Sequence, residues 1–375
     1  MRVVCCRSTL IVMNIMWRLG TKSKKIASTR YRCLIPSENL KPLGYSSQLY
    51  SGSQWPQTVK NSDIMVVVKY FYQSDKQNFE HFKNAGGKII FDVCDLLTFW
   101  NRTEIKTHKI SNINQKIEQS NLFESLLPLA DTLVVPSPYL AKQFQRLTKA
   151  PIKVIPDPIS PTDSDWLSFL YPVTTVPDQL NLLWFGNSGE PLVSGLFDLL
   201  TIKNELEHFA QNHPCTLTVI SDDRVLFQEL ESHFHFMKLR FYKWSPNRVI
   251  NAIRSLDALI LPISKNDFAL SKSANRSLLA LYNGMPVIAT ETEALQDLSE
   301  WISFDFKKGL QQVSSQKENQ LKNKLATDQH LLMQNHGPQS MAKHWDQVFK
   351  TLNKDSILAK TSVNVSLSGK NVTLK

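Results

Sequence analysis

The sequence predicts an α/β protein with two parallel-sheet domains, and three observations support this. Short apolar runs alternate with amphipathic helical segments along most of the 375 residues, which is typical of β-α-β units. Several apolar runs, such as residues 63–69, are uninterrupted, as expected of strands covered on both faces. The alternation breaks at a proline-rich stretch between Pro156 and Pro177 and then restarts. We therefore expect two domains that face one another across a cleft.

Residues 13–160 are predicted to form the first domain. Its expected strands are residues 13–19, 45–50, 63–69, 88–93, 132–135 and 153–156. Its expected helices are residues 28–43, 78–84 and 113–129, and one that begins at Pro138. Ser137 marks the start of this last helix, because serine caps free N–H groups and proline fits the first helical position. Residues 1–12 are interpreted as an N-terminal extension or a misassigned start.

Residues 179–352 are predicted to form the second domain, after a linker at residues 161–178. Its expected strands are residues 180–186, 215–221, 238–242, 257–263 and 286–289. Its expected helices are residues 194–212, a segment capped by Asp222 or Asp223, a segment opened by Ser245 and Pro246, a segment ending at Gly284, and further helices to Leu352. Residues 353–375 are polar and are predicted to form a flexible tail.

The charge of the chain favours an acidic partner. The formal net charge is +10 at pH 7, while 42% hydrophobic residues are normal for a globular protein. No apolar run is long enough to cross a membrane, and the five cysteines include no Cys-x-x-Cys pair. We therefore expect a reducing, cytoplasmic location. The chain carries no zinc-finger or RNP-type motif, so we expect a nucleotide phosphate or an anionic membrane surface as partner, and no nucleic acid.

Residues 270–290 form the candidate anion site. Ser271 or Ser273 is expected to cap a helix that ends at Gly284. The opening of this stretch carries polar and cationic side chains at Lys272, Ser273, Asn275 and Arg276. Helical spacing would place Lys272, Asn275 and Arg276 on one face of the first turn. Free N–H groups and the helix dipole would attract a phosphate there, although a basic, solvated helix start has the same pattern.

Two carboxylates are expected at the ligand-binding edge of the first sheet. Asp92 and Asp95 lie at the end of the strand predicted at residues 88–93. In open α/β sheets, ligands bind beyond the carboxyl ends of the strands. A helix cap is the alternative interpretation of these residues.

Three segments of the chain resemble a known enzyme family. They are ASTRYRCLIPSENL (residues 27–40), ADTLVVPSPYLAKQF with KVIPDPI (within 130–159), and KWSPNRVINAIRSLDALILPI with KSANRSLLALYNGMPVIAT (within 243–290). The sequence resembles GT-B glycosyltransferases, especially the family 4 group that uses nucleotide sugars. The likeness covers residues 13–349 and implies two Rossmann-like domains. The third segment is the most specific, because order and spacing are retained over its whole length.

The sequence departs from this family at two places. Family 4 enzymes commonly carry two glutamates separated by seven residues, and alignment on Gly284 and Pro286 puts those positions at Ser271 and Leu279. The resemblance also implies an arginine and a lysine in the first loop of the second domain. Instead, this chain has a small polar turn there, at Gly186, Asn187, Ser188 and Gly189. The polar role then passes to the opening of residues 270–290, a variant with a Lys-Ser-x-Asn-Arg pattern.

The resemblance implies transfer of a sugar from a nucleotide-diphosphate sugar to an acceptor, with retention, in the assembly of a surface glycan or polysaccharide. Lys272 and Arg276 would stabilise the leaving diphosphate. Donor binding would involve Gly186, Asn187, Ser188, Gly189, Ser273 and Asn275. No metal or other cofactor is expected, since cations can hold the diphosphate.

The remaining candidates concern a glycan or lipid-linked acceptor. The segment from Asp92 to Asp95 resembles an acidic motif that would orient an acceptor hydroxyl. Arg30 and Arg32 would contact an anionic acceptor or the donor phosphates, or are ordinary surface arginines.

Two other function classes fit parts of the sequence. The missing glutamates favour a non-catalytic GT-B-like protein that binds a nucleotide or glycan without turnover. The net charge alone favours a protein of a membrane surface or a nucleic-acid binder. His233 and His235 suggest a metal site, but no third ligand stands nearby in the sequence, and packing at a helix end explains them better.

Overall fold

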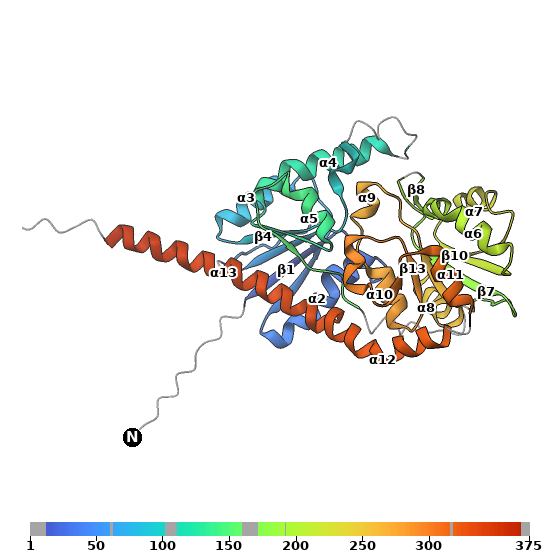
Figure 1. The fold of residues 1–375 in the computed structure, drawn as a ribbon. Coiled ribbons are helices and arrows are strands. Elements are labelled where there is room, and N and C mark those ends of the chain that lie inside the picture. The colour runs from blue at the N-terminus through green and yellow to red at the C-terminus, as the bar shows by residue number, and fades with distance from the viewer. Residues whose placement is uncertain are drawn as a thin grey trace, which may run out of the picture. The chain divides into compact units, whose positions relative to one another are not determined.

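The computed structural model describes residues 13–60, 63–101, 110, 112–159, 172–191, 193–315 and 318–368. They form two six-stranded sheets and a small two-stranded hairpin, with helices packed around the sheets (Figure 1). Both large sheets are parallel, which confirms the predicted fold class. The predicted extension at residues 1–12, residue 160 and residues 161–171 of the predicted linker lie outside the described residues.

The first sheet has the strand order β2-β1-β3-β4-β5-β6. Its strands are β1 (Asn14–Leu19), β2 (Ser46–Ser51), β3 (Ile64–Val68), β4 (Lys88–Asp92), β5 (Thr132–Val135) and β6 (Ile152–Val154). All residues of β3 are buried and apolar, and three of them are valines. Branched side chains fit a pleated, doubly covered strand, so this run folds as the sequence predicts.

The first predicted helix, residues 28–43, is interrupted. It consists of α1 (Ala27–Thr29), a π-helical turn η1 (Arg30–Leu34), α2 (Ile35–Leu40) and a 3-10 turn η2 (Lys41–Leu43). Pro36 explains the interruption, because it has no N–H to bond to the carbonyl of Arg32 one turn earlier. A π turn just before the proline widens the helix and accommodates this lost hydrogen bond.

The later helices of the first half follow the prediction, except for one short helix. They are α3 (Asp75–Asn84), η3 (Leu97–Asn101), α4 (Ile113–Leu126), η5 (Leu127–Leu129) and α5 (Pro138–Gln145). The hydroxyl of Ser137 accepts a hydrogen bond from the N–H of Leu140 at 3.2 Å, which confirms the predicted cap of α5. The short helix η3 was not predicted.

The second sheet has the strand order β11-β10-β7-β12-β13-β14. Its strands are β7 (Leu180–Phe185), β10 (Cys215–Ser221), β11 (Lys238–Lys243), β12 (Ala258–Leu261), β13 (Val287–Ala289) and β14 (Ile302–Ser303). The chain builds outward from β7 to β11 and then returns to add β12 on the other side of β7. This is the strand order of a Rossmann fold, with its topological switch point between β7 and β12.

Two hydrophobic cores cover the second sheet, one on each face. Leu182 and Trp184 of β7 belong to one core, whereas Leu183 and Phe185 belong to the other. Successive side chains of a strand point to opposite faces, so a strand buried on both sides has no polar alternation. This is why residues 182–185 form an uninterrupted apolar run.

The helices from Leu196 onward follow the predicted order, with a correction at the start of the first of them. They are η7 (Leu196–Ile202), α6 (Lys203–Ala210), α7 (Arg224–Glu231), α8 (Pro246–Ser255), α9 (Asp267–Leu270), α10 (Asn275–Tyr282), η8 (Glu293–Leu298), α11 (Phe306–Ser314), α12 (Glu318–His336) and α13 (Pro338–Ser368). Asp223 caps α7 and Ser245 caps α8. The predicted helix at residues 194–212 instead begins as strand β9 (Ser194–Gly195), because Gly195 has a φ of +111° that a helix cannot contain.

The chain divides into two compact units. The first comprises the described residues up to Asp92, Leu129–Leu133 and the chain from Ala342 onward. The second comprises Val93–Pro128 and Val134–Met341. The predicted domain boundary at the linker stays a prediction.

The last helix belongs to the first unit. Trp345 of α13 packs edge-on against Trp17 of β1, with 5.3 Å between ring centroids. The hydroxyl of Tyr45 donates a hydrogen bond to Asp346 at 2.7 Å. The helix α13 thus supplies core residues to a sheet that begins at the other end of the sequence, and it runs on to Ser368.

Candidate functional site

The candidate site lies at the topological switch point of the second sheet. Loops after β7 and after β12 diverge there, and such a divergence leaves a crevice at the carboxyl ends of the two strands. The loop after β7 begins at Gly186, and the chain after β12 leads through α9 to α10. These are the two segments in which the sequence predicts the donor site.

Arg276 of α10 joins these two segments. Its Nη1 atom donates a hydrogen bond to the carbonyl of Phe185, the last residue of β7, at 3.2 Å. A Cβ atom at Gly186 would lie 3.0 Å from the same Nη1 atom. The absence of a side chain at Gly186 therefore lets the guanidinium approach the backbone of the loop.

A buried carboxylate balances the charge of Arg276. Burial lowers the pKa of Arg276, while attraction to Asp198 opposes that shift. Burial likewise raises the pKa of Asp198, and hydrogen bonds from Ser264 and Gly195 oppose it. The guanidinium end of Arg276 is thus enclosed next to a compensating negative charge, although the residue as a whole is partly exposed.

The turn after β7 is held by Asp222. The carboxylate of Asp222 accepts hydrogen bonds from the N–H of Ser188 at 2.7 Å, from the Ser188 hydroxyl at 2.8 Å and from the amide of Asn187 at 2.9 Å. Burial alone would raise the pKa of Asp222, but these bonds from Ser188 hold it below the usual value. The side chains of Asn187 and Ser188 are therefore turned toward Asp222 in this structure.

Gly189 shapes the same turn. It begins β8 (Gly189–Glu190), which pairs with β9 in an antiparallel hairpin. Its φ is +71°, and a Cβ atom there would lie 2.0 Å from the carbonyl oxygen of Ser194. Only glycine fits this position, so Gly189 serves the backbone path of the loop.

The start of α10 differs from the prediction. Neither Ser271 nor Ser273 caps the helix, because α10 begins at Asn275 and Ala274 stands at the N-cap position without a side-chain bond. Lys272 lies in the preceding loop and does not share a helical face with Asn275. The prediction of one common face was therefore wrong. The helix stop at Gly284 is confirmed, since Gly284 has a φ of +80° and follows the last turn.

Lys272 contacts an acidic and an aromatic residue. Its Nζ atom forms an ion pair with Asp95, whose side chain is 13% exposed, against 33% for Lys272. The same Nζ atom lies 4.0 Å from the ring centroid of Phe268, within range of a cation–π interaction. The structure thus brings the predicted residues Lys272 and Asp95 together.

Asp157 binds the two polar residues that flank Ala274. Its Oδ2 atom accepts hydrogen bonds from the Ser273 hydroxyl at 2.6 Å and from the Asn275 amide at 3.3 Å. Asp157 is 4% exposed, so this is a buried anchor for the start of α10. Ser273 and Asn275 fix the loop geometry through this carboxylate.

The two positions aligned with the family glutamates are internal. Ser271 is fully buried, its hydroxyl donates to the carbonyl of Asp267, and its own carbonyl accepts a hydrogen bond from Ser137. Leu279 packs against the hydrophobic core of the second sheet. Neither position offers a carboxylate or a polar side chain to a ligand.

The remaining predicted residues lie in the first unit. Arg32 and Asp92 form a buried ion pair in which Nη2 of Arg32 lies 2.7 Å from Oδ1 of Asp92, with side-chain exposures of 1% and 0%. Arg30 donates to the carbonyl of Lys24 at 2.8 Å, and its guanidinium lies over the ring of Tyr31. Asp92 and Arg32 therefore satisfy each other, whereas Asp95 belongs to the second unit.

Sequence reasoning missed three carboxylates of the site: Asp157, Asp198 and Asp222. Asp222 directly follows β10, and Asp157 follows β6 by three residues. The rule that selected Asp92 and Asp95, a carboxylate at the end of a strand, could have found both. No comparable signal marks Asp198, which lies inside the helical turn η7 among apolar residues.

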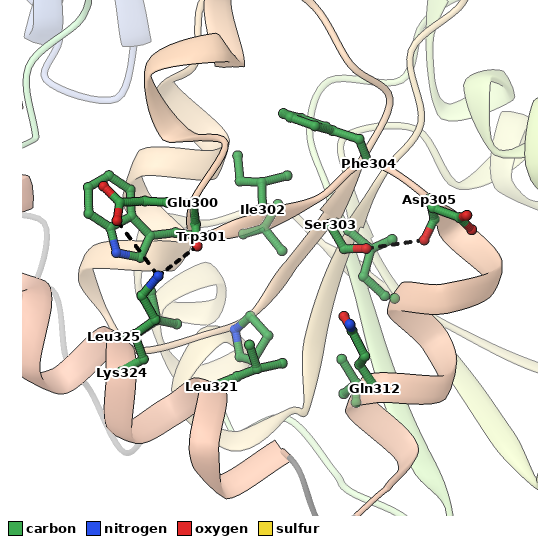
Figure 2. Close-up of a pocket in the computed structure, with 15 residues that line it drawn as sticks. Glu300, Trp301, Ile302, Ser303, Phe304, Asp305, Gln312, Leu321, Lys324 and Leu325 are labelled. Carbon is green, nitrogen blue, oxygen red and sulfur yellow. Dashed lines mark hydrogen bonds and ion pairs between the residues drawn. The ribbon is translucent and has the colours of Figure 1, made fainter.

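A second hollow of the molecule lies elsewhere in the second unit. Figure 2 shows a pocket of about 570 Å³ between β14, α11 and α12, with Trp301 and Lys324 among its lining residues. None of the predicted site residues lines it. The part of the chain that the structure describes contains no cluster of three or more metal-binding side chains, and His233 and His235 belong to no such cluster. Among the described helices, none is long and apolar enough to span a membrane.

Comparison with known proteins yields structural matches only. No family model and no curated protein matches the chain. A glycosyltransferase from Rickettsia africae aligns with a TM-score of 0.59 and 10% identity over 92% of this chain and 99% of that one. An α,α-trehalose 6-phosphate synthase from Burkholderia multivorans aligns with a TM-score of 0.59 and 7% identity, again over 92% and 99%.

A third match includes a bound sugar nucleotide. It is an E. coli structure described as trehalose-6-phosphate bound with UDP-2-fluoro glucose. It aligns with a TM-score of 0.50 and 12% identity over 85% of this chain and 77% of that one. Identities this low show the fold alone. The structural matches and the two parallel α/β sheets together identify the chain as a protein of the GT-B fold.

Proposed function

We propose that this protein is a glycosyltransferase that moves a sugar from a nucleotide-diphosphate sugar to an acceptor. The observation that carries the proposal is the approach of Arg276 to the loop at Gly186, at the switch point of the second sheet. A ligand bound at this point would meet a guanidinium, a lysine and a glycine-containing turn. These groups suit a diphosphate, and the structural neighbours include glycosyltransferases.

The proposed chemistry is electrostatic. The bond between the sugar and the diphosphate weakens as negative charge builds up on the leaving oxygen, and fixed cations near that oxygen lower the barrier. Arg276 supplies a cation whose orientation is fixed, because its Nη1 atom already donates a hydrogen bond to the carbonyl of Phe185. Lys272 supplies a mobile one. With two cations for the diphosphate, we propose that the reaction needs no metal ion.

The acceptor and the stereochemistry follow from the resemblance. We propose a hexosyl transfer with retention to a surface glycan, a polysaccharide or a lipid-linked acceptor. Asp95 is the better candidate to contact an acceptor hydroxyl, because Asp92 is buried against Arg32. This assigns Arg32 and Asp92 to support of the first unit.

A peripheral location at an anionic membrane fits the same proposal. The net charge is +10, and Lys22, Lys24 and Lys25 are exposed in the loop after β1. Cationic side chains attract anionic lipid surfaces. Sedimentation with phosphatidylserine vesicles at low salt should carry the protein into the pellet, and recovery in the supernatant would contradict this location.

One observation favours a second candidate function, a GT-B-like protein that binds a nucleotide without turnover. The positions of the two family glutamates hold the buried Ser271 and the core-packed Leu279. If those glutamates were indispensable for catalysis, this chain would bind a donor and release it unchanged.

Donor turnover separates the two candidates. The protein is incubated with UDP-, GDP- and ADP-sugars, with and without a membrane glycolipid extract, and free nucleoside diphosphate is measured. Release above the protein-free control is the expected result. Thermal stabilisation by a nucleotide without release would select the non-catalytic binder. Neither release nor stabilisation with any of the donors would refute both functions.

A further inference from the structure

Each side chain proposed to hold the diphosphate already has an acidic partner within the second unit. The pairs are Lys272 with Asp95, Ser273 and Asn275 with Asp157, Arg276 with Asp198, and Ser188 with Asp222. An anion that enters this site therefore meets carboxylates as well as donors. The affinity of the site depends on which of these carboxylates can give way.

Two of the aspartates are fixed by burial. Asp157 and Asp198 are each 4% exposed. Asp157 holds two side chains at the start of α10, and Asp198 accepts from Gly195 as well as from Ser264. Displacement of either would leave a buried carboxylate with fewer hydrogen bonds, which is unfavourable. Asp157 and Asp198 therefore hold the site in place, and an incoming anion does not replace them.

The Lys272–Asp95 pair differs from these two aspartates and their partners, because it is more exposed and lies beside an aromatic ring. Lys272 is 33% exposed, and its side chain is long and flexible. An ammonium has three donors, so it can turn from one acceptor to another without losing every bond. Phe268 lies 4.0 Å from the Nζ atom and keeps the ammonium in place during such a turn.

We propose that Asp95 is an internal competitor of the diphosphate: it pairs with Lys272 until a nucleotide phosphate replaces it. The inference rests on the proposed function, because it assumes that a nucleoside diphosphate binds here. A diphosphate carries more negative charge than one carboxylate, so it prevails once it is bound. The exchange lowers the affinity for a diphosphate, which must displace Asp95 from Lys272, and leaves the affinity for an unphosphorylated nucleoside unchanged.

The first test is the affinity for UDP, GDP and ADP by isothermal titration calorimetry with wild type and Asp95→Asn. The asparagine keeps the size of the side chain but removes its charge. Because exposed ion pairs are weak, the affinity should rise about two- to fivefold. The affinity of Asp95→Asn should also fall more steeply with salt, since Lys272 then acts as an uncompensated cation. The unphosphorylated nucleosides should bind both proteins alike.

Three further variants test whether Asp95 changes diphosphate affinity through Lys272. In a Lys272→Ala background, Asp95→Asn should leave the affinity unchanged, because the competitor has lost its target. Asp95→Glu keeps the charge and should bind like wild type. Asp131→Asn removes a carboxylate from a pair of similar exposure in the first unit, 31% for Lys83 and 16% for Asp131, and controls for the change in net charge.

The outcomes distinguish this inference from the proposed function. If wild type binds a nucleoside diphosphate and a folded Asp95→Asn protein binds it equally or more weakly, Asp95 is no competitor. An equal gain in Asp131→Asn, or a gain that persists without Lys272, would also overturn the inference, since charge alone would then explain it. If wild type binds none of the diphosphates, the proposed function fails first.

Discussion

At the scale of single residues, the cations were easier to predict than their partners. Lys272 and Arg276 could be selected from the sequence, because they stand beside a helix start after a buried strand. Their partners lie far away in sequence: Asp95 is 177 residues from Lys272, and Asp157 is 116 residues from Ser273. No local pattern encodes such pairs, so only the folded chain shows that most of the polar donors are already bound.

Gly186 offers a test of the same scale. In Gly186→Ala, the new Cβ atom would lie 3.0 Å from Nη1 of Arg276 and 3.3 Å from the ring of Trp184. The guanidinium must then move by a few tenths of an ångström, and its hydrogen bond to Phe185 weakens. A weakened bond to a charged group should lower the affinity for nucleoside diphosphates about three- to tenfold.

The measurement for Gly186→Ala is calorimetric titration next to a thermal melt. The melting temperature should change little, since Gly186 has no positive φ that an alanine would strain. Wild-type affinity in a normally folded Gly186→Ala protein would show that the position of Arg276 does not set diphosphate binding.

At the scale of elements, helix starts show what local rules can and cannot give. Ser137, Asp223 and Ser245 cap their helices as predicted, because a short polar side chain before a helix can accept hydrogen bonds from its free N–H groups. Ser271 and Ser273 look the same in the sequence, yet both are bound elsewhere, to Asp267 and Asp157. Ser271 thus bonds to the preceding helical turn and Ser273 to a distant carboxylate, and α10 starts later, at Asn275.

Ser137 connects two elements, which gives a second prediction. Its hydroxyl caps α5 at Leu140 and also donates to the carbonyl of Ser271 at 3.0 Å, just before the loop that we propose to bind phosphate. Ser137→Ala should cost about 1 kcal/mol of stability from the lost cap. It should also weaken diphosphate binding severalfold, because the loop loses an anchor. Chemical denaturation and calorimetry measure the two effects.

A matched control for Ser137 is the cap of α11. Asp305 accepts a hydrogen bond from the N–H of Lys308 at 3.0 Å and touches none of the site residues. Asp305→Ala should lose comparable stability and keep wild-type affinity. A similar loss of affinity in both variants would mean that general destabilisation, and not the link to Ser271, explains the effect.

The end of α12 gives a prediction for pH. His336 is 9% exposed and its Nδ1 atom has no hydrogen-bond partner among the described residues. Burial lowers its pKa from the ordinary value of 6.5, against the attraction of Asp297. The unfolded chain therefore binds a proton first on acidification, and stability should fall as the pH drops below 6.5, by at most about 1.4 kcal/mol per pH unit from this group.

His336→Gln removes this titratable group. The melting temperature of the variant should therefore fall less between neutral and mildly acidic pH. His330→Gln, at an exposed position of the same helix, is the control and should leave the wild-type slope intact. An unchanged slope in His336→Gln would show that the ring of His336 is not the group that titrates.

At the scale of the whole molecule, the sequence predicted the architecture well and the connections less well. Continuous apolar runs marked doubly covered strands such as β3 and β12, because such strands are buried on both faces, whereas β2 and β11 carry polar residues. The return of α13 to the first unit, where Trp345 meets Trp17, was beyond local pattern reading. The sequence of a helical segment shows which of its residues are apolar, but it does not show which distant strand these residues will cover.

The GT-B fold alone does not settle the activity, since one fold hosts many functions. The central claim is therefore the phosphate site at the switch point of the second sheet, formed by the turn at Gly186 and by Lys272 and Arg276. Each of the two cations should form a charge-assisted bond to the diphosphate, so its removal should weaken binding about tenfold or more.

The most direct measurement is the affinity of UDP, GDP and ADP for wild type, Lys272→Ala and Arg276→Ala, with each unphosphorylated nucleoside as reference. We expect wild type to bind at least one diphosphate, and each variant to lose about tenfold or more in affinity. Nucleoside binding should stay close to wild type in both variants. The melting temperature should stay close to wild type in Lys272→Ala and fall in Arg276→Ala, because the buried Asp198 then loses its compensating charge. Wild-type diphosphate affinity in both variants would contradict the account.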